Sequence, residues 1–377
     1  MYSSQIYQTK FSKPRIQLHI HLEFSPHALT LWEIAQDNRH KLPFKTLDEF
    51  KKECVTKEPS TLSNHLKPLA WYLPLIKGNC TAIERIAYEM AEQQAREGVV
   101  YSEVHYRPAN LASIIRSDGL SSAETVTYRM VLELVTKGFQ RAEQDYGIKA
   151  RSLLNCGREN PDEAREVLSL CEEFKDKSVV GIGLSGPWIG PNQDLEGEEG
   201  LRKEVIEVFQ RAAQLGIHRT AHTGEAGPPS SVDRHVKFLH VERIGHGYRA
   251  VDDEVLYQDL LKKGIHFETC PHSSYLTGAV PANCIKHPIV KLAEDSADFS
   301  INTDDPLFTG TTLDDEYRLL QKKGLKDFHI VRANFNAAQS CFLPPQEKKD
   351  LFDHLKNVYG ITGNQFCNHL NNNFLTV

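Results

Sequence analysis

The segment Ile16-Gln17-Leu18-His19-Ile20-His21-Leu22-Glu23 alternates apolar and polar residues. This period of two predicts a β-strand with two different faces, because successive side chains of a strand point to opposite sides. His19 and His21 therefore share one face, roughly 6.6 Å apart along the backbone. At that spacing both imidazoles can reach one ion at about 2.0–2.1 Å, the usual zinc–nitrogen distance. The pair predicts half of a metal site, although a chain with 17 histidines also contains such a tripeptide by chance.

From Gly98 onward, short apolar runs alternate with amphipathic, charged segments. With the first segment, the apolar runs give eight expected strands, at 16–22, 99–106, 150–155, 179–184, 219–224, 243–247, 266–270 and 299–302. The expected helices are at 82–97, 123–146, 161–177, 201–215, 230–239, 253–263 and 288–295. Alternating strands and helices predict a parallel sheet, and eight repeats favour a closed (β/α)8 barrel of the TIM type over an open sheet.

The 377 residues contain no linker rich in Pro, Gly or Ser, so we expect a single domain over 1–377. Leu62, Leu66 and other leucines recur at helical spacing within residues 55–80. This segment is expected as a helical insertion, either a lid over a site or core-facing helices. Residues 314–377 are expected as further helices that pack on the barrel.

The composition excludes several classes of partner. A net charge of -6 and a pI near 6.3 provide no basic surface for nucleic acid or an anionic membrane. The sequence has no apolar run long enough to span a membrane, and its first residues lack a basic region followed by an apolar one. Its eight cysteines are scattered without a Cys-x-x-Cys pair. We therefore expect a cytoplasmic protein with a small-molecule substrate. A monomer is favoured.

Further polar residues follow the ends of other expected strands. The fifth strand leads to His222 and Glu225, the sixth ends near His246, and the eighth is followed by Asp304 and Asp305. In a (β/α)8 barrel the catalytic groups lie at the carboxyl ends of several strands. These side chains are therefore expected to meet the first histidine pair, whereas a hydrogen-bonded core histidine would explain only one of them at a time.

The set predicts a mononuclear zinc centre. His19, His21, His222 and one of the two aspartates supply three imidazoles and a carboxylate, which suits one Zn²⁺ per chain with a position left for water. The fourth expected strand ends without the lysine that would bridge a second metal. Zinc lowers the pKa of its water to near 7, so the predicted reaction class is metal-assisted hydrolysis.

Three more residues are candidates for proton transfer and orientation. Glu225 can deliver a proton to a substrate and to a leaving amine, His246 can orient the attacking water, and the aspartate without metal can accept a hydrogen bond. The alternatives are a surface carboxylate for Glu225 and a helix cap for Asp305, which precedes Pro306.

Taken together, these motifs resemble the adenosine deaminase family, mononuclear members of the amidohydrolase superfamily. The resemblance runs from residue 13 to residue 344 and is carried by residues 18–22, 216–225, 242–248, 270–278 and 302–306. It implies the (β/α)8 fold, a zinc cofactor, a role in purine salvage, and hydrolysis of adenosine or 2′-deoxyadenosine to inosine or 2′-deoxyinosine and ammonia.

The resemblance also implies individual roles. It makes Asp304 the fourth zinc ligand beside His19, His21 and His222. Glu225 would protonate the purine at N1, His246 and Asp305 would hold the attacking hydroxide, and the backbone of Gly186 would meet the purine at N3. Substrate contacts are further expected from Glu23, Asp305, Leu62 and Leu66.

The chain departs from the family pattern around the sugar. Glu23 and Phe24 stand where the family usually has aspartate and glycine, and Pro187-Trp188 replaces an acidic pair. Gly183 stands where an aspartate is common, while His65 and Leu69 stand where aromatic residues are common. In the family, the aspartate at the position of Glu23 binds the ribose 5′-hydroxyl.

These departures leave two alternatives open. One is a deaminase of free adenine or of a modified adenine nucleoside, because related adenine deaminases carry a glutamate at the position of Glu23. Against it, those enzymes tend to have an aspartate where this chain has Gly245. The other is a binding or growth-factor-like protein that has lost catalysis, against which the complete ligand set argues.

Overall fold

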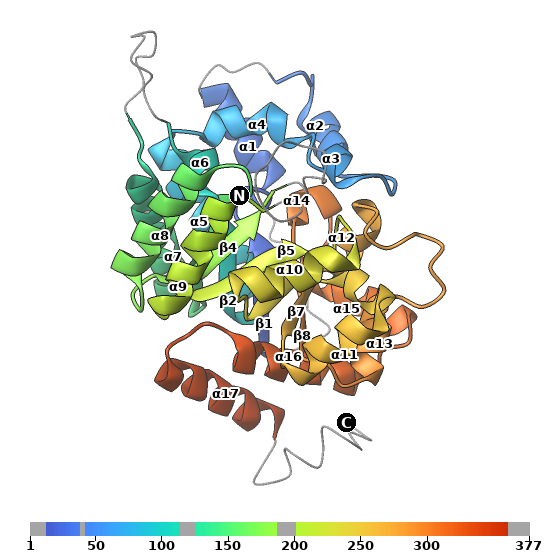
Figure 1. Ribbon diagram of the computed structural model, residues 1–377. Helices are drawn as coiled ribbons and strands as arrows, with labels where there is room; N and C mark the ends of the chain where they lie inside the picture. Colours follow the sequence, from blue (N-terminus) through green and yellow to red (C-terminus); the bar gives the residue numbers. More distant parts are fainter. Residues whose placement is uncertain (1–12, 38–41, 114–124, 187–200, 361–377) are drawn as a thin grey trace.

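Eight parallel strands form one sheet in the order β1 to β8 and curl into a barrel surrounded by helices (Figure 1). The computed structural model describes residues 13–37, 42–113, 125–186 and 201–360. The strands are β1 (Arg15–His21), β2 (Val99–Tyr106), β3 (Lys149–Gly157), β4 (Val179–Ser185), β5 (His218–Thr223), β6 (Arg243–His246), β7 (His266–Thr269) and β8 (Phe299–Ile301). Every expected strand is present, which confirms the predicted fold.

The barrel closes at the segment that follows β8. The His21 amide donates to the Asp304 carbonyl over 2.9 Å, and the Asp304 amide donates to the His19 carbonyl over 3.2 Å. The Asn302 side-chain oxygen accepts from the Leu18 amide at 2.8 Å and from the His19 amide at 3.2 Å. The seam between the first and last strands is thus built from the segments that carry the predicted metal ligands.

Helices follow the strands around the barrel, as the alternation predicted. They are α5 (Cys80–Arg96), α7 (Tyr128–Tyr146), α8 (Pro161–Phe174), α9 (Lys203–Gln214), α10 (Pro229–Leu239), α11 (Glu254–Lys262) and α13 (Pro288–Glu294). Two bounds differ from the prediction by three residues or more, and residues 123–124 of the expected helix lie outside the described part of the chain. The Thr127 side chain accepts from the Met130 amide and so caps α7 at its start, and Asp176, with φ +59°, takes a left-handed conformation that no helix continues through.

Short helices cover the carboxyl ends of the strands. They are α1 (Ala28–Asp37), α2 (Leu47–Cys54), α3 (Leu62–His65), α4 (Leu69–Ile76), α6 (Pro108–Leu111), α12 (Pro271–Leu276), α14 (Pro306–Thr309) and the 3-10 turn η1 (Tyr248–Asp252). Figure 1 shows α2, α3 and α4 together at one end of the barrel. The Tyr72 hydroxyl on α4 donates to the Glu23 carbonyl over 2.8 Å, which ties this cover to the end of β1.

Three C-terminal helices pack at the other end and side: α15 (Leu313–Lys322), α16 (Asp327–Ser340) and α17 (Pro345–Tyr359). On α16, the Asn334 side-chain oxygen accepts from the Ile16 amide at 3.0 Å, where β1 begins. Residues 361–377 of the predicted C-terminal segment lie outside the described part of the chain. Within the described residues, the helices fall short of the length or the apolar character that crossing a membrane requires.

Candidate active site

Three histidines and one aspartate converge at the carboxyl end of the barrel. The His21 Nε2 atom lies 2.9 Å from His222 Nε2 and 3.5 Å from an Asp304 carboxylate oxygen. That same oxygen lies 3.3 Å from His19 Nε2. Asp304 has φ +61°, a left-handed conformation that costs a non-glycine residue free energy and is found preferentially at functional sites. The structure therefore brings together the four residues predicted as metal ligands.

Hydrogen bonds on the far side of two rings fix which nitrogen faces the cluster. His19 Nδ1 donates to Glu268 over 2.6 Å, and His222 Nδ1 donates to the Leu184 carbonyl over 3.0 Å. In a neutral ring this leaves the Nε2 lone pair pointing inward. His19 Nε2 is buried and has no hydrogen-bond partner in the described part of the structure. Inward lone pairs beside a buried carboxylate are the donor set that a zinc-like cation needs.

Burial sets the charges of these groups. It lowers the pKa of His21 to about 3 and holds the pKa of His222 well below its usual value. The pKa of Asp304 is held well below its usual value, despite burial, because of the neighbouring His246 and His19. Despite burial, hydrogen bonds to Asp304 and Glu268 raise the pKa of His19 to about 10. Near neutral pH the His21 and His222 imidazoles are therefore neutral and Asp304 is ionised, and a cation bound at His19 would displace the proton of that ring.

Glu225 and His246 lie beside this cluster. His246 Nε2 is 3.6 Å from a Glu225 carboxylate oxygen and 3.9 Å from the second oxygen of Asp304. Glu225 is 9% exposed, so the surface-carboxylate alternative is wrong. A carboxyl group and an imidazole this close to predicted metal ligands are suited to moving protons and orienting water.

Asp305 is buried next to Asp304 and precedes α14. Its side chain makes no capping hydrogen bond to that helix, so the capping alternative is wrong. Instead, one carboxylate oxygen lies 3.3 Å from His65 Nε2 on α3. Burial and the charges of Asp304 and Glu225 raise the pKa of Asp305 well above its usual value. Asp305 therefore retains a proton that it can donate.

A cavity of about 220 Å³ opens over the cluster. Every predicted site residue except His19 lines it, and His19 lies fully buried beneath it. The lining residues include Glu23, Leu62, Leu66 and Gly186, which were predicted to contact the substrate. Gly186 has φ +99°, a conformation that favours glycine. The predicted Pro187-Trp188 position lies outside the described residues.

Glu23 is held at one oxygen and unpartnered at the other. Its Oε1 atom accepts from the Arg107 amide at 2.8 Å and from the Asn110 side chain at 3.2 Å. Its buried Oε2 atom has no hydrogen-bond partner among the described residues. Burial raises the pKa of Glu23 to about 7. The carboxyl group therefore offers a free polar atom to a ligand in the cavity.

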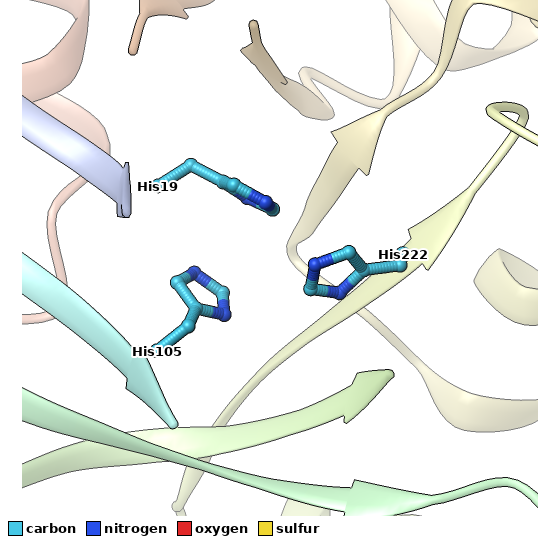
Figure 2. A group of neighbouring side chains, drawn as sticks. All are labelled: His19, His105 and His222. Carbon is cyan, nitrogen blue, oxygen red and sulfur yellow. The ribbon is translucent and has the colours of Figure 1, made fainter. Parts of the chain in front are cut away.

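Residues that the sequence reasoning missed support the cluster from within the barrel. Figure 2 shows His105, from β2, beside His19 and His222. His105 Nε2 lies 3.2 Å from the Leu18 carbonyl and Nδ1 lies 3.3 Å from the Asn155 side-chain oxygen. Because both nitrogens face oxygen atoms, His105 supports the wall of the site and does not extend the ligand set. Glu103 and His105 lie two residues apart in the second strand and therefore share one of its faces. This spacing was the available signal.

An ion-paired layer lies below the cluster. Arg243 is 2.6 Å from carboxylate oxygens of both Glu103 and Glu268, and all three side chains are buried. Glu268 also holds His19, so the same carboxylate joins this layer to the predicted metal ligand. A carboxylate that accepts a hydrogen bond from a ligand imidazole orients the ring and raises its basicity.

A parallel eight-stranded barrel that gathers these donors at the ends of β1, β5, β6 and β8 defines a TIM-barrel hydrolase of the amidohydrolase type. A model of the family described as "Adenosine deaminase" matches residues 14–358. The chain is 41% identical over 355 residues to the adenosine deaminase of Xenopus laevis, covering 93% of this chain and 97% of that one. It is 41% identical over 353 residues to that of Mus musculus, covering 93% and 98%. The chain belongs to the adenosine deaminase family.

Among solved structures, the adenine deaminase from Arthrobacter aurescens matches with a TM-score of 0.78, 24% identity, and coverage of 93% of this chain and 100% of that one. At that identity the likeness supports the barrel fold alone.

Proposed function

We propose that this protein converts adenosine and 2′-deoxyadenosine to inosine and 2′-deoxyinosine, with release of ammonia, using one zinc ion. The observation that carries the proposal is the convergence of His19, His21, His222 and Asp304 beside Glu225, at the base of a cavity of about 220 Å³. Enzymes that carry the name adenosine deaminase are about 40% identical to this chain over nearly its full length.

The four clustered side chains would hold the zinc. Their inward nitrogen lone pairs and ionised carboxylate match its preference for nitrogen and oxygen ligands. When bound, zinc supplies a nucleophile at neutral pH by lowering the pKa of water.

The other residues then have definable tasks. Protonation of the purine N1 by Glu225 makes C6 electrophilic, so that a bond from the water oxygen to C6 forms. His246 and Asp305 orient that water. Glu225, left ionised, takes up the proton that the water loses on attack and passes it to the 6-amino nitrogen. The bond from C6 to that nitrogen then breaks, ammonia leaves, and the remaining proton of the former water returns to Glu225 as the C6 carbonyl forms. The Gly186 backbone meets the purine at N3.

The sugar side favours nucleosides over free adenine. The free Oε2 atom of Glu23 is a buried polar group that a ribose hydroxyl would satisfy, and leaving it unpaired costs free energy. Leu62 and Leu66 would cover the apolar edge of the bound nucleoside, and residues 55–80 would act as a lid. Phe24 also lines the sugar side of the cavity and narrows it. Comparison of adenine with its nucleosides therefore tests the adenine alternative.

Measurement of kcat/KM for adenosine, 2′-deoxyadenosine and adenine on zinc-loaded protein tests the proposal. We expect both nucleosides to exceed adenine by more than about tenfold, or roughly 1.4 kcal/mol of transition-state discrimination. A preference for adenine would reject the nucleoside assignment. Turnover of none of the three would reject the proposed reaction and leave a modified nucleoside or a non-catalytic role.

A further inference from the structure

One buried arginine connects the cluster of predicted metal ligands to the side of the cavity proposed to bind the purine. Arg158 follows β3 and is 4% exposed. Its Nε–H donates to the Gly186 carbonyl over 3.1 Å, and an Nη2–H donates to the carbonyl of His222. One guanidinium thus links the ends of three neighbouring strands, β3, β4 and β5. The residues it holds are a predicted zinc ligand and the glycine proposed to meet the purine.

This arginine is placed at a cost in free energy. No carboxylate in the described part of the chain forms an ion pair with it, and burial lowers its pKa to about 10. Removing a guanidinium from water without a counter-charge is unfavourable unless its hydrogen bonds are met. Among charged groups, Glu225, the proposed proton donor, opposes this lowering of the pKa most strongly. A costly residue in such a place indicates a functional requirement for its geometry.

A histidine on α10 holds the arginine in turn. His235 is 1% exposed, and its Nε2 accepts from an Arg158 Nη1–H over 2.6 Å. Its Nδ1–H donates to the Ser231 carbonyl one turn earlier in the helix. Burial and the nearby guanidinium lower the pKa of His235 to about 3, so the ring stays neutral and keeps its acceptor toward Arg158. Both nitrogens are therefore committed.

We propose that Arg158, held by His235, is a positioning residue that fixes the Gly186 backbone for the N3 side of the purine. The inference rests on the proposed function, because that function supplies the contact between Gly186 and N3. Arg158 acts through Gly186 and His222 and has no task in proton transfer. Its effect is therefore expected in the recognition of N3.

Two ligands that differ only at N3 provide the probe. 1-Deazaadenosine lacks the N1 that Glu225 would protonate, so it binds without turnover, and 1,3-dideazaadenosine also replaces N3 with a C–H group. The dissociation constants of both are measured on zinc-saturated protein. We expect the wild type to bind the first about tenfold more tightly, the value of one well-placed hydrogen bond.

The variants separate positioning from general loss of stability. His235→Asn keeps a donor for Ser231 but does not reach Arg158, whereas His235→Gln places an oxygen near the position of Nε2. We expect His235→Asn and Arg158→Lys to reduce the N3 preference to threefold or less, and His235→Gln to restore most of it. His287→Asn, which replaces another buried neutral histidine outside the cavity lining, should leave it unchanged.

Three outcomes would overturn the inference. A wild-type preference that persists in both His235→Asn and Arg158→Lys would reject the positioning role while the proposed function stands. Equal loss in His287→Asn would show a general effect of destabilisation. A wild type without any N3 preference would remove the Gly186 contact itself, and adenosine turnover by the same protein would show whether the proposed function fails with it. If Arg158→Lys does not fold, the two His235 variants carry the test.

Discussion

His19 Nδ1 lies 2.6 Å from a carboxylate oxygen of Glu268, and both side chains are fully buried. The contact fixes the His19 ring so that its other nitrogen faces His21 and Asp304. Glu268 is in turn held by Arg243 at 2.6 Å and by the Thr220 hydroxyl at 2.9 Å. The orientation of a predicted metal ligand is thus set by the interior of the barrel.

Glu268→Gln should therefore weaken zinc binding about 10- to 100-fold, the usual effect of losing a carboxylate that orients a metal-binding histidine. Competition with a chelator of known affinity measures the change. Glu103→Gln is the matched control, because Glu103 also pairs with Arg243 but is not hydrogen-bonded to His19. Equal weakening in both variants would assign the effect to the ion-paired layer and contradict the role given to Glu268.

Removal of the metal should affect turnover and stability together. Protein from which a chelator has removed the zinc is expected to lose adenosine deamination. Its melting temperature should be at least about 3 °C below that of the zinc-loaded protein, since an ion that binds only the folded state stabilises that state. Added Zn²⁺ should restore both properties. An unchanged melting temperature after verified removal of the metal would show that the His19, His21, His222 and Asp304 cluster does not hold the ion.

Glu23→Ala should distinguish recognition of the sugar from recognition of the base. With the free Oε2 atom gone, kcat/KM for adenosine is expected to fall about 10- to 100-fold, the cost of an unpaired buried hydroxyl. The rate with adenine should change by less than about twofold, because adenine has no sugar to contact Glu23. A parallel loss for adenosine and adenine would place Glu23 outside the sugar site.

A buried histidine predicts sensitivity to acid. His287 Nδ1 accepts from the Ile289 amide at 3.1 Å at the start of α13, and its Nε2 lies 2.8 Å from the Ser274 hydroxyl oxygen. Burial lowers its pKa from 6.5 to about 3. Since the unfolded chain binds this proton below pH 6.5 and the folded chain does not until about pH 3, stability is lost as the pH falls through that window.

His287→Asn keeps an acceptor for the helix cap and removes the titration. Between pH 6 and pH 4 its free energy of unfolding should fall less steeply than that of the wild type, by up to about 1.4 kcal/mol per pH unit. Denaturant unfolding of metal-free protein measures this without interference from zinc release. Parallel pH dependences would show that His287 is protonated in the folded state.

The fold was predictable because each strand carries its own signal. Period-two alternation and short apolar runs are local patterns, so all eight strands could be placed from sequence. Helix ends were less predictable, since they depend on a single cap such as Thr127 or a left-handed residue such as Asp176. The ligands at strand ends were predictable because the barrel itself brings strand ends together.

The support of the site could not be predicted in the same way. Glu268 lies inside β7, where the sequence does not distinguish an inward carboxylate from an outward one without the register of the barrel. Arg158 and His235 meet across 77 positions, through packing of α10 beside β5 that no local pattern encodes. Glu225 and Asp305 were predicted, whereas their burial, which removes the surface and capping alternatives, is a property of the packed structure.

The most direct measurement of the central claim is the rate of adenosine deamination by zinc-saturated Glu225→Gln. The amide cannot donate a proton to N1 as an acid does, so we expect kcat to fall by at least about 100-fold, within the range of general acid catalysis. Zinc content and melting temperature should match the wild type, because Glu225 is no ligand. A rate near that of the wild type at equal zinc content would contradict the proposed mechanism.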